Sequence, residues 1–320
     1  MTKTVLITGG TGFLGSYLTY GLLHNGFHVV VLKRSTSATW RIIDFIDEVK
    51  CYDIDIVGIE PAFKDQYIDT VIHTACCYGR KNEKISDIVD TNVMFGINLL
   101  EYAEVFNTNT FINTDTFYAT SLIPKYKSYA LSKRHFVEWL KQASKKVKIV
   151  NMKLEHMYGP KDDKTKFIPW VLDQLDQNKK EINLTSGIQE RDFIYVTDVV
   201  SAYKKILECH DKLDTFNEFD VGTGKSTSVK QFITELHSQY KKLNPENITD
   251  LLFGKIPHYE NEPMHVTVDI NSLISIGWKP EISFKEGIRG MLAAAHPSFP
   301  YPPHPSLFQT HYYFQTNTQI

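Results

Sequence analysis

The feature that most constrains this chain is a glycine-rich turn close to its start. The apolar, β-branched run Val5–Thr8 leads directly into Gly9-Gly10-Thr11-Gly12-Phe13-Leu14-Gly15, and leucines at helical spacing follow. Glycines at positions 9, 12 and 15 let the backbone turn tightly and approach a pyrophosphate, whose charge then lies at the positive end of the helix. This strand–turn–helix context predicts a dinucleotide site that includes Gly9, Thr11, Gly12, Phe13, Leu14 and Gly15; the alternative is a purely structural turn.

Short buried strands alternate with helical patterns over the first half of the chain. Such alternation predicts right-handed crossovers and a parallel sheet covered on both faces, an α/β doubly wound fold of the Rossmann type. The expected strands are 5–8, 28–32, 49–52, 70–74, 110–113 and 148–153.

The regular alternation weakens after Tyr158-Gly159-Pro160. We expect a nucleotide-binding domain over residues 1–160, with later segments returning to it, and a smaller C-terminal substrate lobe over 161–295. The last segment, 296–320, holds five prolines and no Asp, Glu, Lys or Arg. It is predicted to be a flexible tail or an artificial extension.

Composition favours a small-molecule ligand. The 320-residue chain has 35 basic and 37 acidic residues, and this balance gives no electrostatic footprint for nucleic acid or a membrane surface. No apolar run is long enough for a membrane span, and the four cysteines lack metal-site spacing. We therefore expect a cytoplasmic protein with buried thiols, no metal site and no nucleic-acid or membrane partner.

The second strand ends in Lys33-Arg34-Ser35-Thr36, without the carboxylate that grips the ribose in NAD-selective sheets. Arg34 offers a planar fork for a 2′-phosphate, and Lys33, Ser35 and Thr36 are further donors. This pattern favours NADP(H) over NAD, although a lone surface arginine is also common. Asp53, with Ile54 beside it, or Asp55 is expected to contact the adenine.

Tyr129 and Lys133 are four residues apart in a helical stretch, so the phenol and the ammonium share one face. The positive charge is expected to lower the pKa of the phenol and make it a proton carrier. Thr114 ends the fifth strand and is expected to hydrogen-bond the same substrate oxygen. The three residues, in this order after a glycine-rich turn, indicate a catalytic site.

These segments resemble the extended short-chain dehydrogenases that act as nucleotide-sugar epimerases, dehydratases and reductases, over about residues 3–295. Segments 112–116, 132–136, 153–160 and 166–169 are similar to CDP-abequose synthases, which reduce the 4-keto group of a CDP-linked 3,6-dideoxy sugar with NADPH. The resemblance implies a homodimer and cofactor contacts from Thr74, Ala75, Asn92, Tyr129 and Lys133. It implies substrate contacts from Asp115, Thr116, His156, Lys166, Phe167 and Arg191.

The same comparison leaves alternatives open for individual residues. Arg191 is expected at the substrate diphosphate, or else in a salt bridge with an acid. The second phosphate arginine of the group would fall near Tyr259 and is missing, so diphosphate binding must be weaker or use another donor, such as His258. For His156, a packed and hydrogen-bonded histidine is favoured over a substrate contact.

Thr116 stands where 4,6-dehydratases of the group have a glutamate base, and threonine is no base at neutral pH. We therefore expect NADPH-dependent reduction of a 4-keto sugar that is CDP-linked. The alternatives are the same reaction on a dTDP-linked sugar, an NAD-dependent 4-epimerase, and a non-catalytic module that senses the cofactor.

Overall fold

A seven-stranded parallel sheet forms the centre of the protein, in the order β11-β6-β5-β4-β1-β2-β3. The computed structural model describes residues 2–295, so the prediction for the segment 296–320 lies outside the described residues. In chain order the strands are β1 (Thr4–Thr8), β2 (His28–Lys33), β3 (Lys50–Asp53), β4 (Thr70–His73), β5 (Thr110–Thr116), β6 (Lys148–Leu154) and β11 (Phe216–Val221). This order confirms the predicted doubly wound α/β fold.

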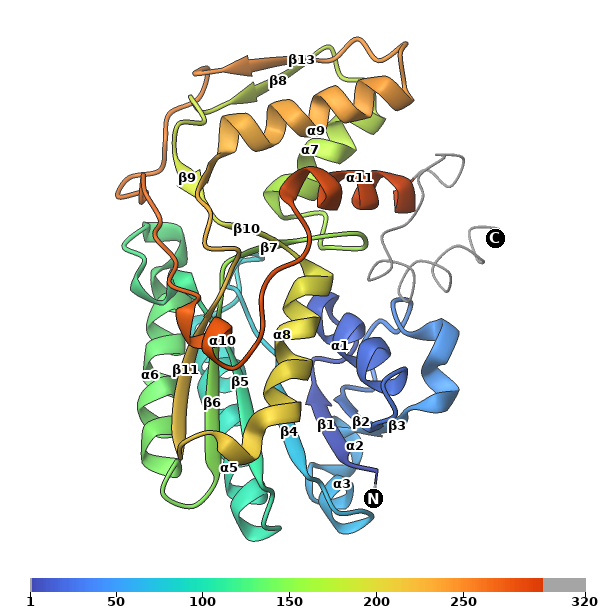
Figure 1. Ribbon diagram of the computed structural model, residues 1–320, viewed down its shortest axis with the longest axis vertical. Coiled ribbons are helices and arrows are strands. Elements are labelled where there is room, and N and C mark those ends of the chain that lie inside the picture. Colours follow the sequence, from blue (N-terminus) through green and yellow to red (C-terminus); the bar gives the residue numbers. More distant parts are fainter. Residues whose placement is uncertain (1, 296–320) are drawn as a thin grey trace.

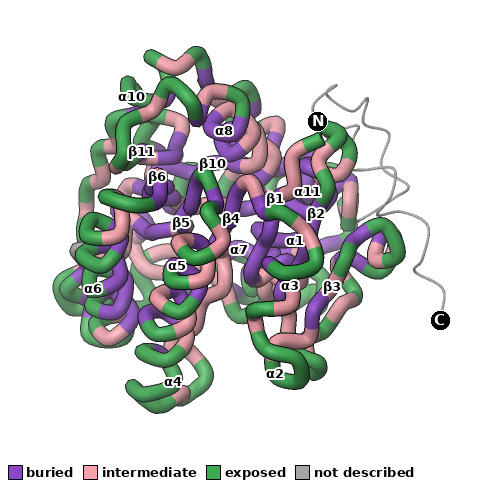
Figure 2. Tube along the Cα trace, turned by 90° about the horizontal axis from the view of Figure 1, so that it is seen from below, coloured by how far each residue is buried: buried purple, intermediate pink, exposed green. Residues whose placement is uncertain are grey.

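Helices cover both faces of the sheet. One face packs against α1 (Phe13–Leu23) and α8 (Val196–Cys209), and the other against α5 (Phe95–Val105) and α6 (Lys127–Ala143). Residues of β1, β4, β5 and β6 are largely buried between these layers, whereas the outward turns of the helices are exposed (Figure 2). Because these strands are buried on both faces, they appear in the sequence as short, β-branched apolar runs, and such runs predicted their positions.

Shorter segments on the flanks complete this half of the molecule. They are η1 (Ile43–Glu48), α2 (Ile54–Val57), α3 (Glu60–Lys64), α4 (Ile85–Val89), η2 (Asp90–Met94), η3 (Phe117–Thr120), η4 (Pro124–Tyr126), η5 (His210–Lys212) and α10 (Asn271–Ser275).

A smaller lobe lies beyond the carboxyl ends of the sheet strands (Figure 1). Its own core joins α7 (Phe167–Asp176), α9 (Val229–Leu243) and α11 (Phe284–Ala295). The lobe region also contains three two-stranded sheets. They are β7 (His156–Tyr158) with β10 (Phe193–Tyr195), β8 (Glu181–Leu184) with β13 (Asp250–Phe253), and β9 (Glu190–Arg191) with β12 (Thr227–Ser228).

Two segments that follow the first lobe helix, α8 and β11, pack with the central sheet. Helix α8 packs on α1, and β11 adds a seventh strand beside β6. The carboxyl ends of all seven strands therefore face the lobe, where parallel sheets of this kind bind their ligands.

Candidate active site

The glycine turn has the geometry that a dinucleotide requires. Gly9 has a φ of +69°, and its carbonyl accepts a 2.8 Å hydrogen bond from the Gly12 amide. A Cβ on Gly15 would lie 2.0 Å from the Gly9 carbonyl oxygen, so no side chain fits there. No side chain caps the amino end of α1, and its first turn has no acid. The end of this helix can therefore receive a pyrophosphate.

Thr74 and Ala75 lie against the glycine turn, and their contact with the cofactor stays a prediction. A Cβ on Gly9 would lie 2.7 Å from Thr74 Oγ1 and 2.8 Å from the Ala75 amide nitrogen. Thr74 Oγ1 donates to the Thr8 carbonyl at 2.7 Å, which fixes the two strand ends together. This close approach brings the Thr74–Ala75 backbone against the glycine turn at the ends of β1 and β4.

The buried Asn92 side chain is hydrogen-bonded within the chain, and its contact with the cofactor stays a prediction. Its side-chain amide both accepts from the Cys77 amide at 2.7 Å and donates to the Cys77 carbonyl at 2.8 Å. It also donates to Ser132 Oγ at 2.9 Å, and Ser132 in turn donates to the Tyr129 carbonyl at 2.8 Å. Asn92 thus ties the loop after β4 to the helix that carries Tyr129. Sequence reasoning missed Ser132 in this clamp.

Two of the four residues at and after the end of β2, Lys33 and Ser35, are bonded to acids at and just after the end of β3. Lys33 forms an ion pair with Asp53. The Asp55 carboxylate accepts from the Ser35 amide at 2.7 Å and from Ser35 Oγ at 2.6 Å, and these bonds lower the pKa of Asp55. Within residues 2–295, no hydrogen bond or ion pair engages the exposed Arg34 guanidinium. The contact of Arg34 with a 2′-phosphate stays a prediction.

Tyr129 and Lys133 lie one turn apart on the buried face of α6. Burial raises the pKa of Tyr129 well above its ordinary value, and the nearby Cys76 and Tyr78 add to this, whereas a hydrogen bond with Thr116 opposes it. Lys133 donates to the Thr114 carbonyl at 2.6 Å. The expectation that Lys133 lowers the pKa of this phenol is wrong here, because desolvation of the phenolate dominates. The phenol is accordingly protonated at neutral pH.

Thr114 and Thr116 face different partners although both end β5. Thr114 Oγ1 lies 2.7 Å from the hydroxyl of Tyr203 on α8, a fully buried residue. Thr116 bonds Tyr129, and its Oγ1 accepts from the Tyr118 amide at 3.1 Å. The role of Thr114 at the substrate oxygen stays a prediction. Thr116 supplies a hydroxyl beside the Tyr129 phenol.

Asp115 points into a buried polar network between the strands. Asn151 donates to its carboxylate at 3.1 Å and to Glu218 at 2.9 Å. Burial raises the pKa of Asp115, and Lys133 opposes this shift. Asp115 therefore contributes to the electrostatics around Lys133, whether or not it contacts a substrate.

His156 is packed among aromatic rings. Its ring lies 4.2 Å from Phe117 and 5.8 Å from Phe193, centroid to centroid. Burial lowers its pKa well below the ordinary value, and Arg191 and Lys166 lower it further. Its Nδ1 lies 3.8 Å from Glu155 Oε2 and has no hydrogen-bond partner within the described part of the chain, so the buried ring is neutral.

Lys166 and Phe167 begin the lobe helix α7. Lys166 pairs with the buried Asp162 at 2.8 Å and lies 5.2 Å from the ring of Phe13, at the start of α1. The ring of Phe167 stacks with Trp170 at 6.3 Å, and both are substantially exposed. Lys166 thus links the lobe to the glycine turn.

Arg191 is held in a salt bridge, the alternative that the sequence left open. It pairs with Glu262 at 2.7 Å, and its side chain is only 5% exposed. Near Tyr259, where the second arginine is missing, the cation is Lys125, whose ammonium lies 5.9 Å from the Tyr259 ring. No local pattern pointed to Lys125, because it lies in η4, far from Tyr259 along the chain.

All four cysteines are free, and they are partly exposed, which corrects the expectation of buried thiols. Over residues 2–295, no cluster of His, Cys, Asp and Glu could hold a metal ion. In the same range, none of the helices has the length and apolar character to cross a bilayer.

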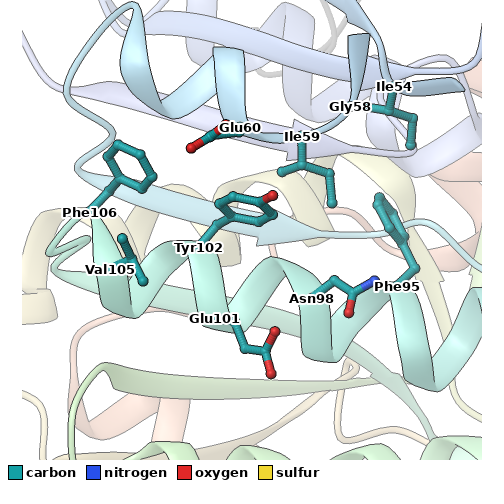
Figure 3. A pocket seen from close by; sticks show the side chains of 10 residues that line it. All are labelled: Ile54, Gly58, Ile59, Glu60, Phe95, Asn98, Glu101, Tyr102, Val105 and Phe106. Atoms are coloured by element: carbon teal, nitrogen blue, oxygen red, sulfur yellow. The ribbon is translucent and has the colours of Figure 1, made fainter. Parts of the chain in front are cut away.

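A cavity of about 760 Å³ lies between α5 and the α2–α3 segment (Figure 3). Ile54 is the one predicted site residue among those that line it, and Tyr129, Lys133 and Arg191 are not. The catalytic candidates therefore do not lie in this cavity but gather at the carboxyl ends of the strands.

The buried Glu155 carboxyl makes the stability of the protein depend on pH. Burial and the neighbouring carboxylates Asp192 and Asp220 raise the pKa of Glu155 to about 8. The folded chain keeps a proton that the unfolded chain loses near pH 4.5, so the free energy of unfolding should fall as pH rises from 4.5 to 8. Glu155→Gln should remove this fall and stabilise the protein at pH 8 by on the order of 2 kcal/mol.

Urea unfolding at pH 5 and pH 8 measures this effect. The exposed Glu246→Gln serves as the control and should keep the wild-type pH dependence. An unchanged pH dependence in Glu155→Gln would show that this carboxyl is ionised in the folded chain.

Comparison with known proteins gives consistent matches over most of the chain. The profile of the NAD dependent epimerase/dehydratase family matches residues 5–222. The sequence is 33% identical to CDP-abequose synthase of Salmonella typhimurium, over 91% of this chain and 98% of that protein. UDP-glucose 4-epimerase of Thermotoga maritima with UDP-glucose has a similar structure, with a TM-score of 0.75, 20% identity and coverage of 90% and 97%. UDP-glucuronic acid 4-epimerase of Bacillus cereus, in complex with UDP-glucuronic acid and NAD, is also similar, with a TM-score of 0.74 and 21% identity. The match covers 90% of this chain and 97% of that chain.

Proposed function

The chain belongs to the NAD dependent epimerase/dehydratase family, and on this premise we propose that it reduces the C4 keto group of a CDP-linked deoxyhexose with NADPH. It is a nucleotide-sugar enzyme that uses a nicotinamide dinucleotide. The observation that carries the choice of reduction is the pair of Thr116 and Tyr129. Thr116 supplies a hydroxyl where a dehydratase needs a base, and burial keeps Tyr129 protonated and ready to donate.

The residues divide the reaction between them. When bound, NADPH supplies the hydride that adds to the sugar C4. Tyr129 gives its phenolic proton to the oxygen at C4, so the ketone becomes an alcohol, and the phenolate regains a proton from solvent. Thr116, or Thr114 after leaving Tyr203, hydrogen-bonds that oxygen. Lys133 holds the nicotinamide ribose and stabilises the transient phenolate.

The CDP assignment is supported by the relative at 33% identity, whose name specifies CDP-abequose. The same arrangement of Tyr129 and Lys133 would serve a dTDP-linked ketone. We further propose that the enzyme acts in deoxysugar synthesis for O-antigen-type polysaccharides such as those of lipopolysaccharide, in the cytoplasm and as a homodimer.

Isotope transfer tests the reductase proposal. With NADPH deuterated at the transferred position, the product should carry deuterium at C4 of the sugar, as read by mass spectrometry and NMR. Deuterium taken up at C5 from heavy water, with water lost from C6, would instead identify a dehydratase.

Cofactor choice rests on Arg34. We predict that Arg34→Ala weakens NADPH binding by about 10- to 100-fold, because a charge-assisted contact with the 2′-phosphate is lost, and leaves NADH binding unchanged. Asp55→Asn should act in the opposite direction, since it releases the Ser35 donors toward the phosphate. Titration of both cofactors by fluorescence measures the four constants. Equal losses for NADPH and NADH in Arg34→Ala would exclude the 2′-phosphate contact.

An NAD-dependent 4-epimerase is the second candidate. Asp53 and Asp55 bring two carboxylates to the adenosine end of the cofactor site, and they offset the charges of Lys33 and Arg34. An epimerase would interconvert C4 epimers of a nucleotide hexose with catalytic NAD and without net NADPH consumption. Product analysis in the absence of added NADPH separates the two.

A further inference from the structure

Arg191, the arginine that the family resemblance assigns to the substrate diphosphate, already has an anionic partner. Arg191 Nη2 donates to Glu262 Oε1 at 2.7 Å. Both side chains are buried, with 5% of Arg191 and 9% of Glu262 exposed. A diphosphate that reaches this guanidinium therefore meets a carboxylate in its place.

The guanidinium does not depend on that carboxylate for its position. Arg191 Nη1 donates to the Glu190 carbonyl at 2.6 Å and to the Pro263 carbonyl at 2.7 Å. These two bonds fix one nitrogen on the backbone, whereas Glu262 holds only the other. Loss of the Glu262 contact would thus leave the arginine oriented, with Nη2 available to an incoming oxygen.

Glu262 also has partners that remain when it leaves Arg191. Its second oxygen lies 3.2 Å from His258 Nδ1 and accepts from the Tyr259 amide at 3.3 Å. His258 Nε2 lies 2.8 Å from Ser186 Oγ on the strand side of the lobe. Glu262 can therefore retreat into its own turn without becoming an unpaired buried charge.

We propose that Glu262 is an internal competitor for the substrate's diphosphate: it occupies Arg191 in the free enzyme, gives way to the diphosphate, and so determines the affinity of the site for phosphate-bearing ligands. The inference rests on the proposed function in taking a nucleoside diphosphate as the bound group. It explains why a family arginine is almost fully buried and neutralised. It also gives His258 a role as a support for Glu262, in place of a direct phosphate donor.

Calorimetric titration of the full chain with CDP, dTDP and cytidine tests this inference. Glu262→Gln should bind CDP and dTDP about tenfold more tightly than the wild type, because the competing charge is gone. Cytidine binding should not change, since that ligand has no phosphate. The matched control is Glu260→Gln, an exposed acid in the same turn, which should leave all three affinities as they are.

A second variant guards against loss of fold in the first. Glu262→Asp keeps the charge but draws it back by one methylene, and should tighten CDP binding by a smaller factor; melting temperatures verify that each variant is folded. Weaker or unchanged CDP and dTDP binding by folded Glu262→Gln would overturn the inference, because Glu262 would then orient Arg191 or be irrelevant to it. If neither nucleotide binds the wild type, the nucleotide-sugar proposal falls as well.

Discussion

Tyr129→Phe should reduce the NADPH-dependent kcat by about a thousandfold, because positioned proton transfer contributes about 10² to 10⁴. The ring is buried on α6 and its hydroxyl bonds Thr116, so the phenylalanine should pack in the same place. Cofactor affinity should stay within about twofold of the wild-type value, since the lost atom acts on the sugar oxygen.

Stopped-flow single-turnover kinetics separates this effect on chemistry from binding and product release. Tyr67→Phe is the control, because its exposed hydroxyl contacts only the Asn107 carbonyl among the bonds of the described chain, and it should keep full activity. Retention of more than about a tenth of the wild-type rate in Tyr129→Phe would assign the proton to another donor.

Gly15→Ala should abolish dinucleotide binding and destabilise the protein by several kcal/mol. The added Cβ would lie 2.0 Å from the Gly9 carbonyl oxygen and 2.8 Å from the Gly10 Cα, and both are backbone atoms that cannot rotate away. The first turn of α1 must then move off the strand end where the pyrophosphate is expected.

The melting temperature of the cofactor-free protein and a titration with NADPH measure the two parts of this prediction. Gly12→Ala gives a graded comparison, since its Cβ would meet only the Gly9 carbonyl, at 3.1 Å. It should melt closer to the wild type than Gly15→Ala does. Equal stability and cofactor affinity in Gly15→Ala and the wild type would show that the turn has a different conformation in solution.

Most of the fold was predictable because the sheet is buried on both faces. Six strands were located from short apolar runs, and in the structure their ends move by up to three residues. The seventh strand, β11 (Phe216–Val221), was not named in advance, because it lies at the sheet edge and alternates apolar with polar residues. Asn217, Glu218 and Asp220 in that strand hide the apolar signal that revealed the others.

The site was predictable where its residues are close in sequence and not where partners come from afar. The four-residue spacing of Tyr129 and Lys133 specified their shared helix face. By contrast, Tyr203 is 89 positions from Thr114, and Glu262 is 71 positions from Arg191. No local pattern reports such contacts, which arise when α8 and the 258–262 turn pack against the strand ends. The raised pKa of Tyr129 is likewise a consequence of burial, which spacing cannot give.

The most direct test of the proposed activity follows NADPH absorbance with purified enzyme and three ketones: a CDP-linked 4-keto-3,6-dideoxyhexose, a CDP-linked 4-keto-6-deoxyhexose and a dTDP-linked 4-keto-6-deoxyhexose. We expect one NADPH to be consumed for each C4 alcohol formed, with the highest kcat/KM on a CDP-linked ketone and much slower turnover with NADH. No NADPH consumption with any of the three ketones, at enzyme concentrations that bind the cofactor, would contradict the assignment as a 4-ketoreductase.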